Sequence, residues 1–387
     1  MENDNKLLAG AIKILNKLNE KGYEAYMVGG FVRDYQLGME GKDIDITTNA
    51  LPNVVQELFP NNFSKSLKFK TVNVREGDYV YEITTYRVDK SYKDHRHPES
   101  KVSLSLKEDV KRRDFTVNAM CMDKDLKLID YVGGINDLKL HILRCVGSPK
   151  RRFNEDALRM FRAFRFAARL DFKIDSLTFE GIVSNANLVK YLSKERIRTE
   201  LEETVEAPYF KSVLPQMLDS GIFKSLPDIN EALGLINVAY KPFKFMNLMV
   251  LASFLKGEVT NDVLFTKKER RYIEDAMFFM NLLKERKLTP FDIFDRDIQA
   301  LYEAQTSLSL IKSCPYKLSD LDELVNNLPI KKAKELNITG NDIKDALKIE
   351  DSKDIKDYIT ELEKAVIYNK VENDTQKLVE YLKGTIA

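Results

Sequence analysis

Residues 25–48 decide the architecture of the N-terminal part, and they read AYMVGGFVRDYQLGMEGKDIDITT. The short apolar run at residues 25–28 is typical of a buried strand, and it leads directly into Gly29 and Gly30. A glycine pair between a strand and a helix lets backbone N–H groups approach a triphosphate, because no Cβ stands in the way. Arg33 follows in the first turn of the expected helix, where its guanidinium can reach the β- or γ-phosphate through two hydrogen bonds. The stretch therefore predicts a phosphate-binding turn.

Two aspartates come just after this turn. Asp43 and Asp45 alternate with isoleucines, so in a strand both carboxylates project from the same face. Two like charges this close are costly unless a cation lies between them, and Mg²⁺ prefers such oxygen ligands. A two-metal site lowers the pKa of an attacking hydroxyl and neutralises a leaving pyrophosphate. An isolated pair of this kind is usually two surface charges, but the glycine turn favours a metal site. Glu82, in the strand pattern of residues 81–84, is the candidate for a third carboxylate.

Composition and charge limit the kind of protein this is. The 387 residues include 61 Lys and Arg against 60 Asp and Glu, so any grip on a nucleic acid must come from local basic patches. The three cysteines are scattered and form no CxxC pair, which fits a reduced setting without structural zinc. The N-terminus has no signal-peptide pattern, and no apolar run approaches the ~20 residues of a membrane span. We therefore expect a cytoplasmic protein with no membrane partner.

The secondary-structure signals change near residue 150. Strand patterns precede it, including a hairpin at residues 71–86, and long amphipathic helical patterns follow it. The charged stretches 266–271 and 284–287 are mixed in sign, which favours solvated helix faces over RNA contacts for both. The sequence thus predicts an α+β protein with a small sheet-containing head and a helical body.

Residues 111–120, KRRDFTVNAM, form a second nucleotide-binding candidate. Arg113 can bind a phosphate or a base, and Asp114 and Asn118 can hydrogen-bond the 2′- and 3′-hydroxyls that distinguish an NTP from a dNTP. Together with GGxxRD and DxD, this run resembles the signature of the DNA polymerase β nucleotidyltransferase superfamily. In detail it resembles the bacterial and eukaryotic class of tRNA nucleotidyltransferases, whose close relatives are the bacterial poly(A) polymerases. The match of the whole run disfavours an ordinary basic loop.

The resemblance implies both an architecture and a reaction. It implies a polymerase-β-like catalytic head with a small mixed sheet at residues 1–149, a helical neck at 150–210, and a helical body and tail at 211–387 that bind tRNA. The implied reaction is template-independent addition of C, C and A to the 3′ acceptor end of tRNA, using CTP and ATP and releasing pyrophosphate. Mg²⁺ on Asp43 and Asp45 is the implied cofactor, and no obligate protein partner is inferred.

Residues 155–165, EDALRMFRAFR, carry a row of charges at helical spacing, namely Asp156, Arg159 and Arg162. The pattern alone favours a solvated helix face, whereas the resemblance implies base selection. Asp156 accepts from the amino group of cytosine or adenine while Arg159 donates to the ring nitrogen. Uracil and guanine present the reverse pattern and would leave buried groups unpaired, at about 1–3 kcal/mol each. Arg162 and Arg165 are implied to make further nucleotide or phosphate contacts.

Three other segments match the family. Residues 87–98 are polar and indicate a mobile loop, which the resemblance associates with addition of the terminal A. Its full length disfavours an enzyme that adds only CC. Residues 130–138 match a link between head and neck. Residues 192–201, with Ser193, Arg196 and Glu200, are expected to form a capped helix that stabilises the neck.

Three alternatives remain open. An enzyme that adds only the terminal A would share every motif above. A poly(A) polymerase is less favoured, because the chain has no long basic C-terminal extension. A non-catalytic RNA-binding protein on the same fold is disfavoured by the intact pair Asp43 and Asp45, since two adjacent carboxylates have no other physical reason to persist. No motif match extends beyond residue 203, so the tRNA-binding role of the C-terminal half rests on the resemblance alone.

Overall fold

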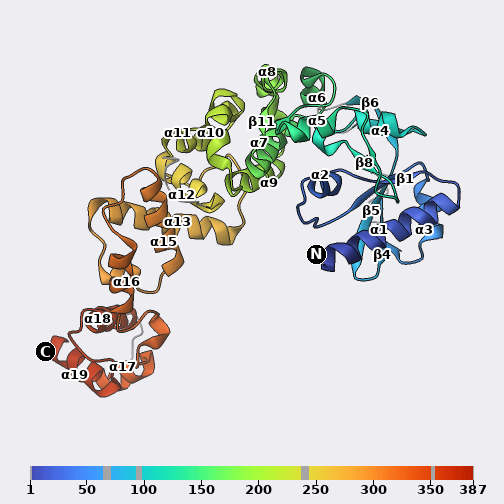
Figure 1. Cartoon of the computed structure of the whole chain (residues 1–387). Helices are drawn as coiled ribbons and strands as arrows, with labels where there is room; N and C mark the ends of the chain where they lie inside the picture. Colours follow the sequence, from blue (N-terminus) through green and yellow to red (C-terminus); the bar gives the residue numbers. More distant parts are fainter. Residues whose placement is uncertain (1, 64–70, 93–97, 237–243, 350–353, 387) are drawn as a thin grey trace. The chain divides into compact units, whose positions relative to one another are not determined.

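The computed structural model describes residues 2–63, 71–92, 98–236, 244–349 and 354–386. Their contacts divide the chain into two compact units, residues 1–225 and 226–387. Strands lie in the first unit, and no strand occurs in the described residues after Ile174. Figure 1 shows the sheet in the blue-to-cyan part of the chain and helices in the later colours. The α+β prediction is confirmed. The boundary at residues 225/226 lies inside the predicted body, and the division into head, neck and body stays a prediction.

The head is built on a seven-stranded mixed sheet in the order β3-β4-β5-β2-β1-β8-β9. The strands are β1 Ala25–Val28, β2 Asp45–Thr48, β3 Asn62–Phe63, β4 Thr71–Glu76, β5 Tyr79–Thr85, β8 Cys121–Met122 and β9 Leu128–Ile129. The predicted hairpin is present, with β4 and β5 antiparallel. β2 runs parallel to β5, and the register pairs Asp45 with Glu82. The strand pairing therefore sets two acidic residues side by side.

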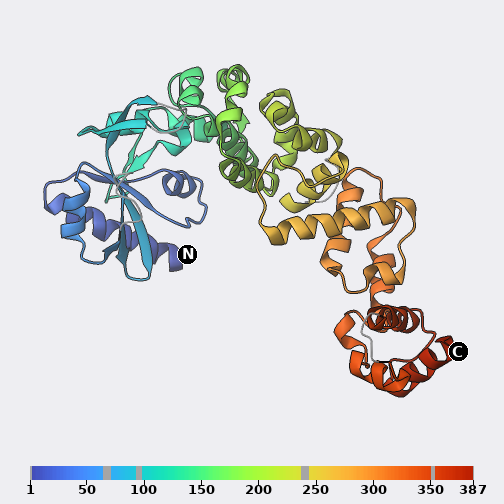
Figure 2. The same ribbon diagram turned by 180° about the vertical axis from the view of Figure 1, so that it is seen from behind.

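One face of this sheet is covered and the other carries the acidic residues. Ile46 and Tyr81 are fully buried on the covered face. The Tyr81 hydroxyl donates to the Leu7 carbonyl of α1 (Glu2–Glu20) at 2.7 Å. Helix α1 crosses the strands in both views (Figure 1 and Figure 2). Because side chains alternate along a strand, the exposed Asp45 and Glu82 point to the opposite face.

The segment predicted as a loop at residues 87–98 contains strands. β6 (Arg87–Tyr92) pairs antiparallel with β7 (Pro98–Val102), and residues 93–97 lie outside the described residues. Polar composition indicated a loop because these side chains do not alternate between apolar and polar, but the backbone pairing supplies the hydrogen bonds of a two-stranded sheet. The loop prediction is therefore wrong for the two flanks.

Helices predominate from residue 149 onward in the first unit. They are α6 Pro149–Glu155, α7 Leu158–Leu170, α8 Ser176–Asn185, α9 Lys194–Val205 and α10 Phe210–Asp219. One face of α7 is apolar and buried, with Phe161, Phe164 and Ala168 each at most 1% exposed. This face lies against neighbouring helices, since α7 contacts α9 and α10. Burying one face of α7 leaves its arginines directed elsewhere.

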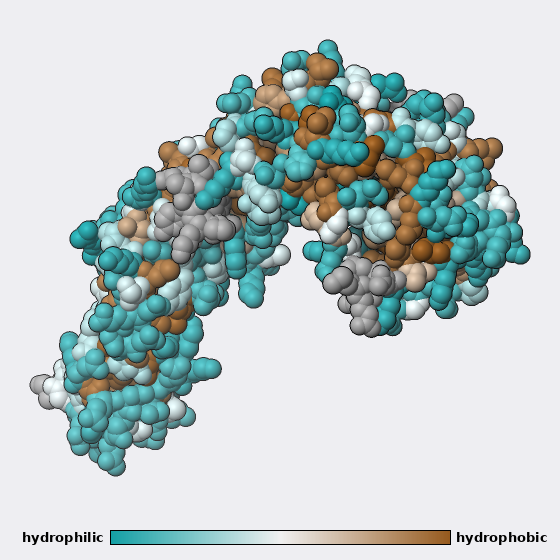
Figure 3. Space-filling model, in the orientation of Figure 1, coloured by the Kyte–Doolittle hydropathy of each residue, from teal (hydrophilic) through white to brown (hydrophobic). Residues whose placement is uncertain are grey.

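The second unit is all-helical in its described residues. Its helices are α11 Pro227–Leu235, α12 Phe245–Lys256, α13 Lys267–Glu285, α14 Pro290–Ile293, α15 Ile298–Leu310, α16 Leu318–Asn326, α17 Gly340–Leu347, α18 Ile355–Ile367 and α19 Thr375–Ile386. α12, α13 and α15 contact one another, and α13 lies beside α15 (Figure 1). The surface of the C-terminal segment is mostly hydrophilic in Figure 3. No helix among the described residues has the length and apolar character needed to cross a membrane.

Candidate active site

The glycine turn, Asp45 and Arg113 meet at one place. Gly29 precedes α2 (Gly30–Gln36) and has φ +82° and ψ −136°, a conformation that side chains disfavour. A Cβ added there would lie 3.7 Å from Asp45 Oδ2 and 3.9 Å from Arg113 Nη1. The glycine therefore leaves open the space between a carboxylate and a guanidinium, as the predicted phosphate-binding turn requires.

Three carboxylates lie close to this turn. Asp43, Asp45 and Glu82 are all exposed to solvent, while Ile44 and Ile46, which alternate with the two aspartates, are buried, so the predicted alternation holds. Although exposed, Asp45 is surrounded by enough protein that partial desolvation, followed by repulsion from Glu82 and Asp43, raises its pKa to about 6. A divalent cation would relieve this repulsion.

The chemistry of the three carboxylates supports metal binding, although their present positions do not form a complete set of metal ligands. Among the described residues, no group of three acidic, histidine or cysteine side chains already converges as metal ligands do. Asp45 and Glu82 are adjacent through strand register, and Asp43 lies just before β2 begins. The carboxylates fit a hard divalent cation, which would draw them together.

Arg33 lies near the start of α2 and makes contacts inside the protein that the sequence did not predict. Its side chain is buried, and it donates to Asn118 Oδ1 at 2.6 Å and to Asp34 Oδ1 at 2.8 Å. Burial lowers the pKa of Arg33 despite the neighbouring Asp34. The structure thus joins two predicted nucleotide-binding residues, Arg33 and Asn118, to each other. The guanidinium of Arg33 here holds Asn118 and Asp34 in place. Its contact with a triphosphate stays a prediction.

Adjacent residues Arg113 and Asp114 make separate contacts. Arg113 reaches toward the glycine turn and donates to buried Asp109 at 3.2 Å. Asp114 accepts a hydrogen bond from Arg162 Nε on α7 at 2.8 Å, and Nη2 of the same guanidinium forms an ion pair with it at 2.7 Å. Burial opposes ionisation of Asp114, but the charge and hydrogen bonds of Arg162 outweigh it and lower the pKa to about 2. Asp114 is therefore a fixed anion that ties the head segment to the neck.

The charged row predicted on one helix is interrupted. α6 ends at Glu155, Asp156 has an extended backbone with φ −146° and ψ 106°, and α7 begins at Leu158. The Asp156 side chain accepts from the Leu158 N–H at 3.1 Å, the local contact by which aspartate competes with helix continuation. Asp156 and Arg159 thus belong to a turn and a helix, and the single-helix prediction is wrong.

Both predicted base-reading groups already have partners inside the protein. Asp156 accepts from Arg196 of α9 at 2.9 Å. Arg159 donates to Glu155 at 3.1 Å and to the Arg152 carbonyl at 2.8 Å. These partners fix the orientation of the two side chains.

Three of the predicted arginines cluster around the ring of Phe166. Arg33, Arg162 and Arg165 lie 5.4, 5.1 and 4.7 Å from the centre of Phe166. Arg165 pairs with Glu200 of α9 at 3.1 Å. Sequence reasoning assigned no site role to Phe166, Arg196 or Glu200. The family match of residues 192–201 was the only sequence signal for Arg196 and Glu200, and it indicated a helix that stabilises the neck. In the structure, α9 contacts the predicted base-reading residue Asp156 through Arg196.

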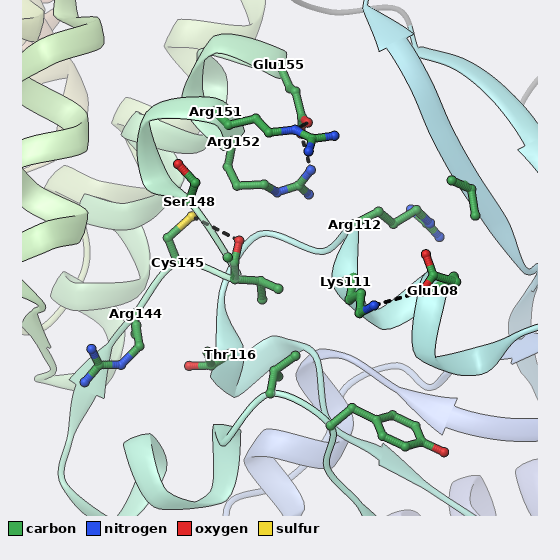
Figure 4. A pocket seen from close by; sticks show the side chains of 15 residues that line it. Glu108, Lys111, Arg112, Thr116, Arg144, Cys145, Ser148, Arg151, Arg152 and Glu155 are labelled. Atoms are coloured by element: carbon green, nitrogen blue, oxygen red, sulfur yellow. Dashed lines mark hydrogen bonds and ion pairs between the residues drawn. The ribbon is translucent and has the colours of Figure 1, made fainter.

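A pocket lined by charged residues lies beside this constellation, on the segment that carries Arg113. It has a volume of about 580 Å³. Its charged lining is Glu108, Lys111, Arg112, Arg144, Arg151, Arg152 and Glu155. In Figure 4, Arg151, Arg152 and Glu155 lie across the pocket from Lys111, Arg112 and Glu108. Arg152 donates to the Arg113 carbonyl at 2.9 Å. Arg112 pairs with Asp109, and Arg144 pairs with Asp137 and Asp175, so acids outside the lining already balance two of its five cations.

Known families match most of the chain. The poly A polymerase head domain matches residues 25–144, the probable RNA and SrmB-binding site of polymerase A matches residues 171–233, and the putative tRNA nucleotidyltransferase domain 2 matches residues 253–382. The first match contains the glycine turn, all three carboxylates and Arg113.

Individual relatives match nearly end to end. The CCA-adding enzyme of Geobacillus sp. (strain WCH70) is 35% identical over 96% of both chains, and that of Ligilactobacillus salivarius is 34% identical over 96% of this chain and 95% of its own. The crystal structure of Bacillus stearothermophilus CCA-adding enzyme in complex with CTP superimposes with a TM-score of 0.84, at 28% identity, over 98% of this chain and 97% of that one. By sequence and by fold, the chain belongs to the family of CCA-adding enzymes.

Proposed function

We propose that this chain adds C, C and A to the 3′ end of tRNA from CTP and ATP and releases pyrophosphate, without a nucleic-acid template. The supporting observation is the convergence of the Gly29 turn, Arg113 and the exposed acids of β2 and β5 in a chain that matches CCA-adding enzymes over its length. The likeness to a CCA-adding enzyme in complex with CTP supports the choice of nucleotide. We also propose that the protein acts in the cytoplasm, a location that a tRNA substrate supports.

The reaction centre is proposed at Asp43 and Asp45, with Glu82 as the third acid. These residues would hold Mg²⁺, which supplies charge for activating the tRNA 3′-hydroxyl and for stabilising the leaving pyrophosphate. The Gly29 turn brings backbone N–H groups to the triphosphate, and Arg113 adds a positive charge beside it. Together these residues place negative phosphate oxygens between a cationic group and the acidic metal ligands.

Ribose recognition is proposed at Asn118. Its Oδ1 is taken by Arg33, while its Nδ2 is buried and has no partner among the described residues. A buried amide without a partner costs about 1–3 kcal/mol, so a ligand oxygen at this point would be stabilised. A ribose hydroxyl offers such an oxygen, and Asp114, held by Arg162, fixes the same segment.

Base choice is proposed at Asp156 and Arg159. Asp156 accepts from the amino group that cytosine and adenine share, and Arg159 donates to their ring nitrogen. Arg196 and Glu155 orient these two groups. Uracil and guanine invert both donor and acceptor, so each leaves buried polar groups unpaired.

The direct test uses three tRNA transcripts that end at the discriminator base, at +C and at +CC, each with labelled CTP or ATP. The proposed function requires C on the first two and A on the third. Extension of the +CC transcript alone, and only by A, would show an A-adding enzyme instead. Long A tracts on any transcript would show a poly(A) polymerase, and Asp45→Ala should abolish all incorporation.

A further inference from the structure

Asp109 is an acid at a core position of helix α4 (Leu106–Lys111). Leu106, three residues before it, and Val110, one residue after it, are buried in the apolar core of the head. Asp109 lies on the same side of the helix and is 0% exposed, whereas its neighbour Glu108 is partly exposed. Moving a carboxylate from water to a protein interior is costly unless charged or hydrogen-bonding groups surround it. An acid at this position therefore requires compensating contacts.

The Asp109 carboxylate accepts hydrogen bonds from three segments of the head. Its Oδ1 accepts from Arg112 Nε at 2.8 Å and from the N–H of Arg87, the first residue of β6, at 3.2 Å. Its Oδ2 accepts from Arg113 Nη2 at 3.2 Å and from the hydroxyl of Thr47, on β2, at 3.3 Å. Helix α4 also contacts β6 along the chain (Figure 1). One carboxylate thus connects the β6–β7 hairpin, the arginine pair and β2.

The charges of this cluster do not cancel. Arg112 meets Asp109 with two nitrogens, because its Nη2 lies 2.7 Å from the Oδ1 that also accepts from Nε. Arg113 meets the carboxylate with Nη2 alone. Burial opposes ionisation of Asp109, but the charges of Arg112 and Arg113 outweigh it and lower the pKa of the carboxyl. Two guanidiniums on one carboxylate leave a positive charge uncompensated within the cluster, and Arg113 is the less fully paired of the two.

Arg113 is held from one side, which leaves its other side for a ligand. Among the described residues, Asp109 is the only hydrogen-bond acceptor for the Arg113 side chain, and Nε of that side chain is buried without a partner. Its Nη1 lies toward the Gly29 turn, 3.9 Å from a Cβ added there. A long side chain with one anchor samples fewer rotamers than a free one. Asp109 therefore fixes the direction in which Arg113 presents its remaining donors.

Asp109 also separates Arg113 from a second carboxylate. A Cβ added at Gly29 would lie 3.7 Å from Asp45 Oδ2, so Arg113 and Asp45 flank the same small space. Opposite charges attract strongly where protein shields them from water. Thr47 follows Asp45 by two residues on β2 and projects from the same face of the strand. Because one oxygen of Asp109 takes both Arg113 and Thr47, the guanidinium is anchored beside Thr47 and kept off Asp45.

We propose that Asp109 is a positioning residue for nucleotide binding, which holds Arg113 beside the Gly29 turn and away from Asp45. The space between the guanidinium and the acid then stays open for a triphosphate. This role rests on the proposed function for the identity of the nucleotide, but it requires nucleotide binding alone and no incorporation. The cost of burying a carboxylate at a core position is then offset by the order that it gives to the site.

A double-mutant cycle tests whether Asp109 acts through Arg113. Asp109→Asn removes the charge at constant size, Arg113→Met removes the guanidinium, and a third variant combines both. The dissociation constant of CTP is measured by isothermal titration calorimetry with Mg²⁺ and without tRNA. Each single variant should weaken CTP binding roughly tenfold, as expected for one charged hydrogen bond. The double variant should bind CTP no more weakly than Arg113→Met, because the effects of residues that act together do not add.

A matched control on the same helix separates positioning from a general loss of charge. Glu108→Gln changes the residue next to Asp109, and Glu108 pairs with Lys111 at 2.9 Å rather than with Arg113. This variant should change the CTP constant less than about twofold, as expected for a half-exposed ion pair.

A second pair of variants keeps the test decisive if Asp109→Asn does not fold, since that change leaves buried arginines without their counter-charge. Thr47→Val retains the carboxylate and removes only the hydrogen bond from β2. Thr48→Val is its control, because the Thr48 hydroxyl donates to the Glu24 carbonyl at 2.6 Å instead. Thr47→Val should weaken CTP binding about threefold, and Thr48→Val should leave it unchanged. Equal constants for these two variants would contradict the anchoring of Arg113 through β2.

The outcomes distinguish this role from failure of the proposed function. Losses that multiply in the double variant would overturn the role of Asp109, even in a chain that adds C, C and A. An unchanged CTP constant in either single variant, or an equal loss in Glu108→Gln, would do the same. CTP binding that follows the expected cycle in a chain that adds no nucleotide would leave Asp109 in its role and overturn the proposed function.

Discussion

At the scale of single residues, two glycines with nearly the same positive φ separate backbone strain from a role in the site. Gly29 has φ +82° and lies beside Asp45 and Arg113, whereas Gly22 has φ +83° and nothing within 4 Å of an added Cβ. An alanine at either position must adopt a positive φ, which costs on the order of 1 kcal/mol or more.

Only one of these alanines should affect the reaction. Gly29→Ala places a methyl group between the carboxylate and the guanidinium, so we expect kcat/KM for CTP to fall at least tenfold. Gly22→Ala should lower the Tm and leave kcat/KM nearly unchanged. Steady-state kinetics and thermal melts of both variants check this, and equal kinetic losses would contradict a phosphate-binding role for the Gly29 turn.

Arg196 gives a second residue-scale prediction. It holds the carboxylate of Asp156 at 2.9 Å, so Arg196→Ala frees that carboxylate to turn away from the base. We expect the preference for CTP over UTP to fall about tenfold, the cost of roughly one misplaced hydrogen bond. Arg198→Ala on the same helix is the control, because Arg198 pairs with Glu202 and not with Asp156. The measurement is the ratio of kcat/KM for the two nucleotides. A preserved ratio in Arg196→Ala would remove Arg196 from base selection.

At the scale of elements, the packing of three helices predicts a pH dependence. Glu303 of α15 accepts from Tyr272 of α13 at 3.3 Å and from Asn247 of α12. Desolvation raises the pKa of Glu303 from 4.5 to about 7, although the Tyr272 hydroxyl and Lys244 oppose the rise. The folded chain therefore binds this proton more tightly than the unfolded chain. Its contribution to stability is complete below pH 4.5 and is lost as the pH rises through about 7.

Glu303→Gln should remove that dependence, because the amide keeps the hydrogen-bond acceptor without the charge. We expect the parent to lose on the order of 1–3 kcal/mol more than Glu303→Gln between pH 5 and pH 8, for the transition of the second unit. Urea unfolding at the two pH values measures this difference. Glu274→Gln on the exposed side of α13 should track the parent. If Glu303→Gln and the parent lost the same free energy of unfolding between pH 5 and pH 8, Glu303 would not be the source of the pH dependence.

Some elements could be predicted from sequence and others could not, for physical reasons. Gly29 and the alternating aspartates are local signals, since positive φ and strand alternation need no distant partner, and both are present. The break at Asp156 was missed because apolar residues keep helical spacing through α6 and α7, while the side-chain hydrogen bond that ends the helix leaves no periodic trace. β6 and β7 were missed because their side chains show no alternation of apolar and polar residues, so only the backbone hydrogen bonds reveal the strands.

The same limit applies to the site. Arg33 was expected at the phosphate because it follows the glycines, but its partner Asn118 is distant in sequence. The pairing of Asp156 with Arg196 likewise requires α9 to fold against α7. Sequence motifs therefore identified which residues gather at the site, and only the fold shows which of them hold one another.

At the scale of the whole molecule, the division into two units predicts two unfolding steps. Residues 1–225 contain the proposed nucleotide site, and residues 226–387 contain Glu303. Calorimetry should resolve two transitions, and CTP with Mg²⁺ should raise only one of them, by about 2.7 kcal/mol at a hundred times the dissociation constant.

Assignment of these transitions follows from variants already named. Gly22→Ala should lower the transition that CTP raises, and Glu303→Gln should move the other one at pH 8. A single transition that shifts as a whole with CTP would show that the two units unfold together.

The pairing of Asp156 with Arg196 and of Arg159 with Glu155 has a consequence for how a base is chosen. Both pairs can persist while a base binds, because a carboxylate accepts several hydrogen bonds and a guanidinium has five donors. The two side chains are therefore ordered before a nucleotide arrives, so a correct base binds without the entropy cost of ordering them. A wrong base meets the same fixed groups, which cannot turn to match its inverted donors and acceptors. Rigidity in the empty pocket thus does the work that a template strand does in other polymerases.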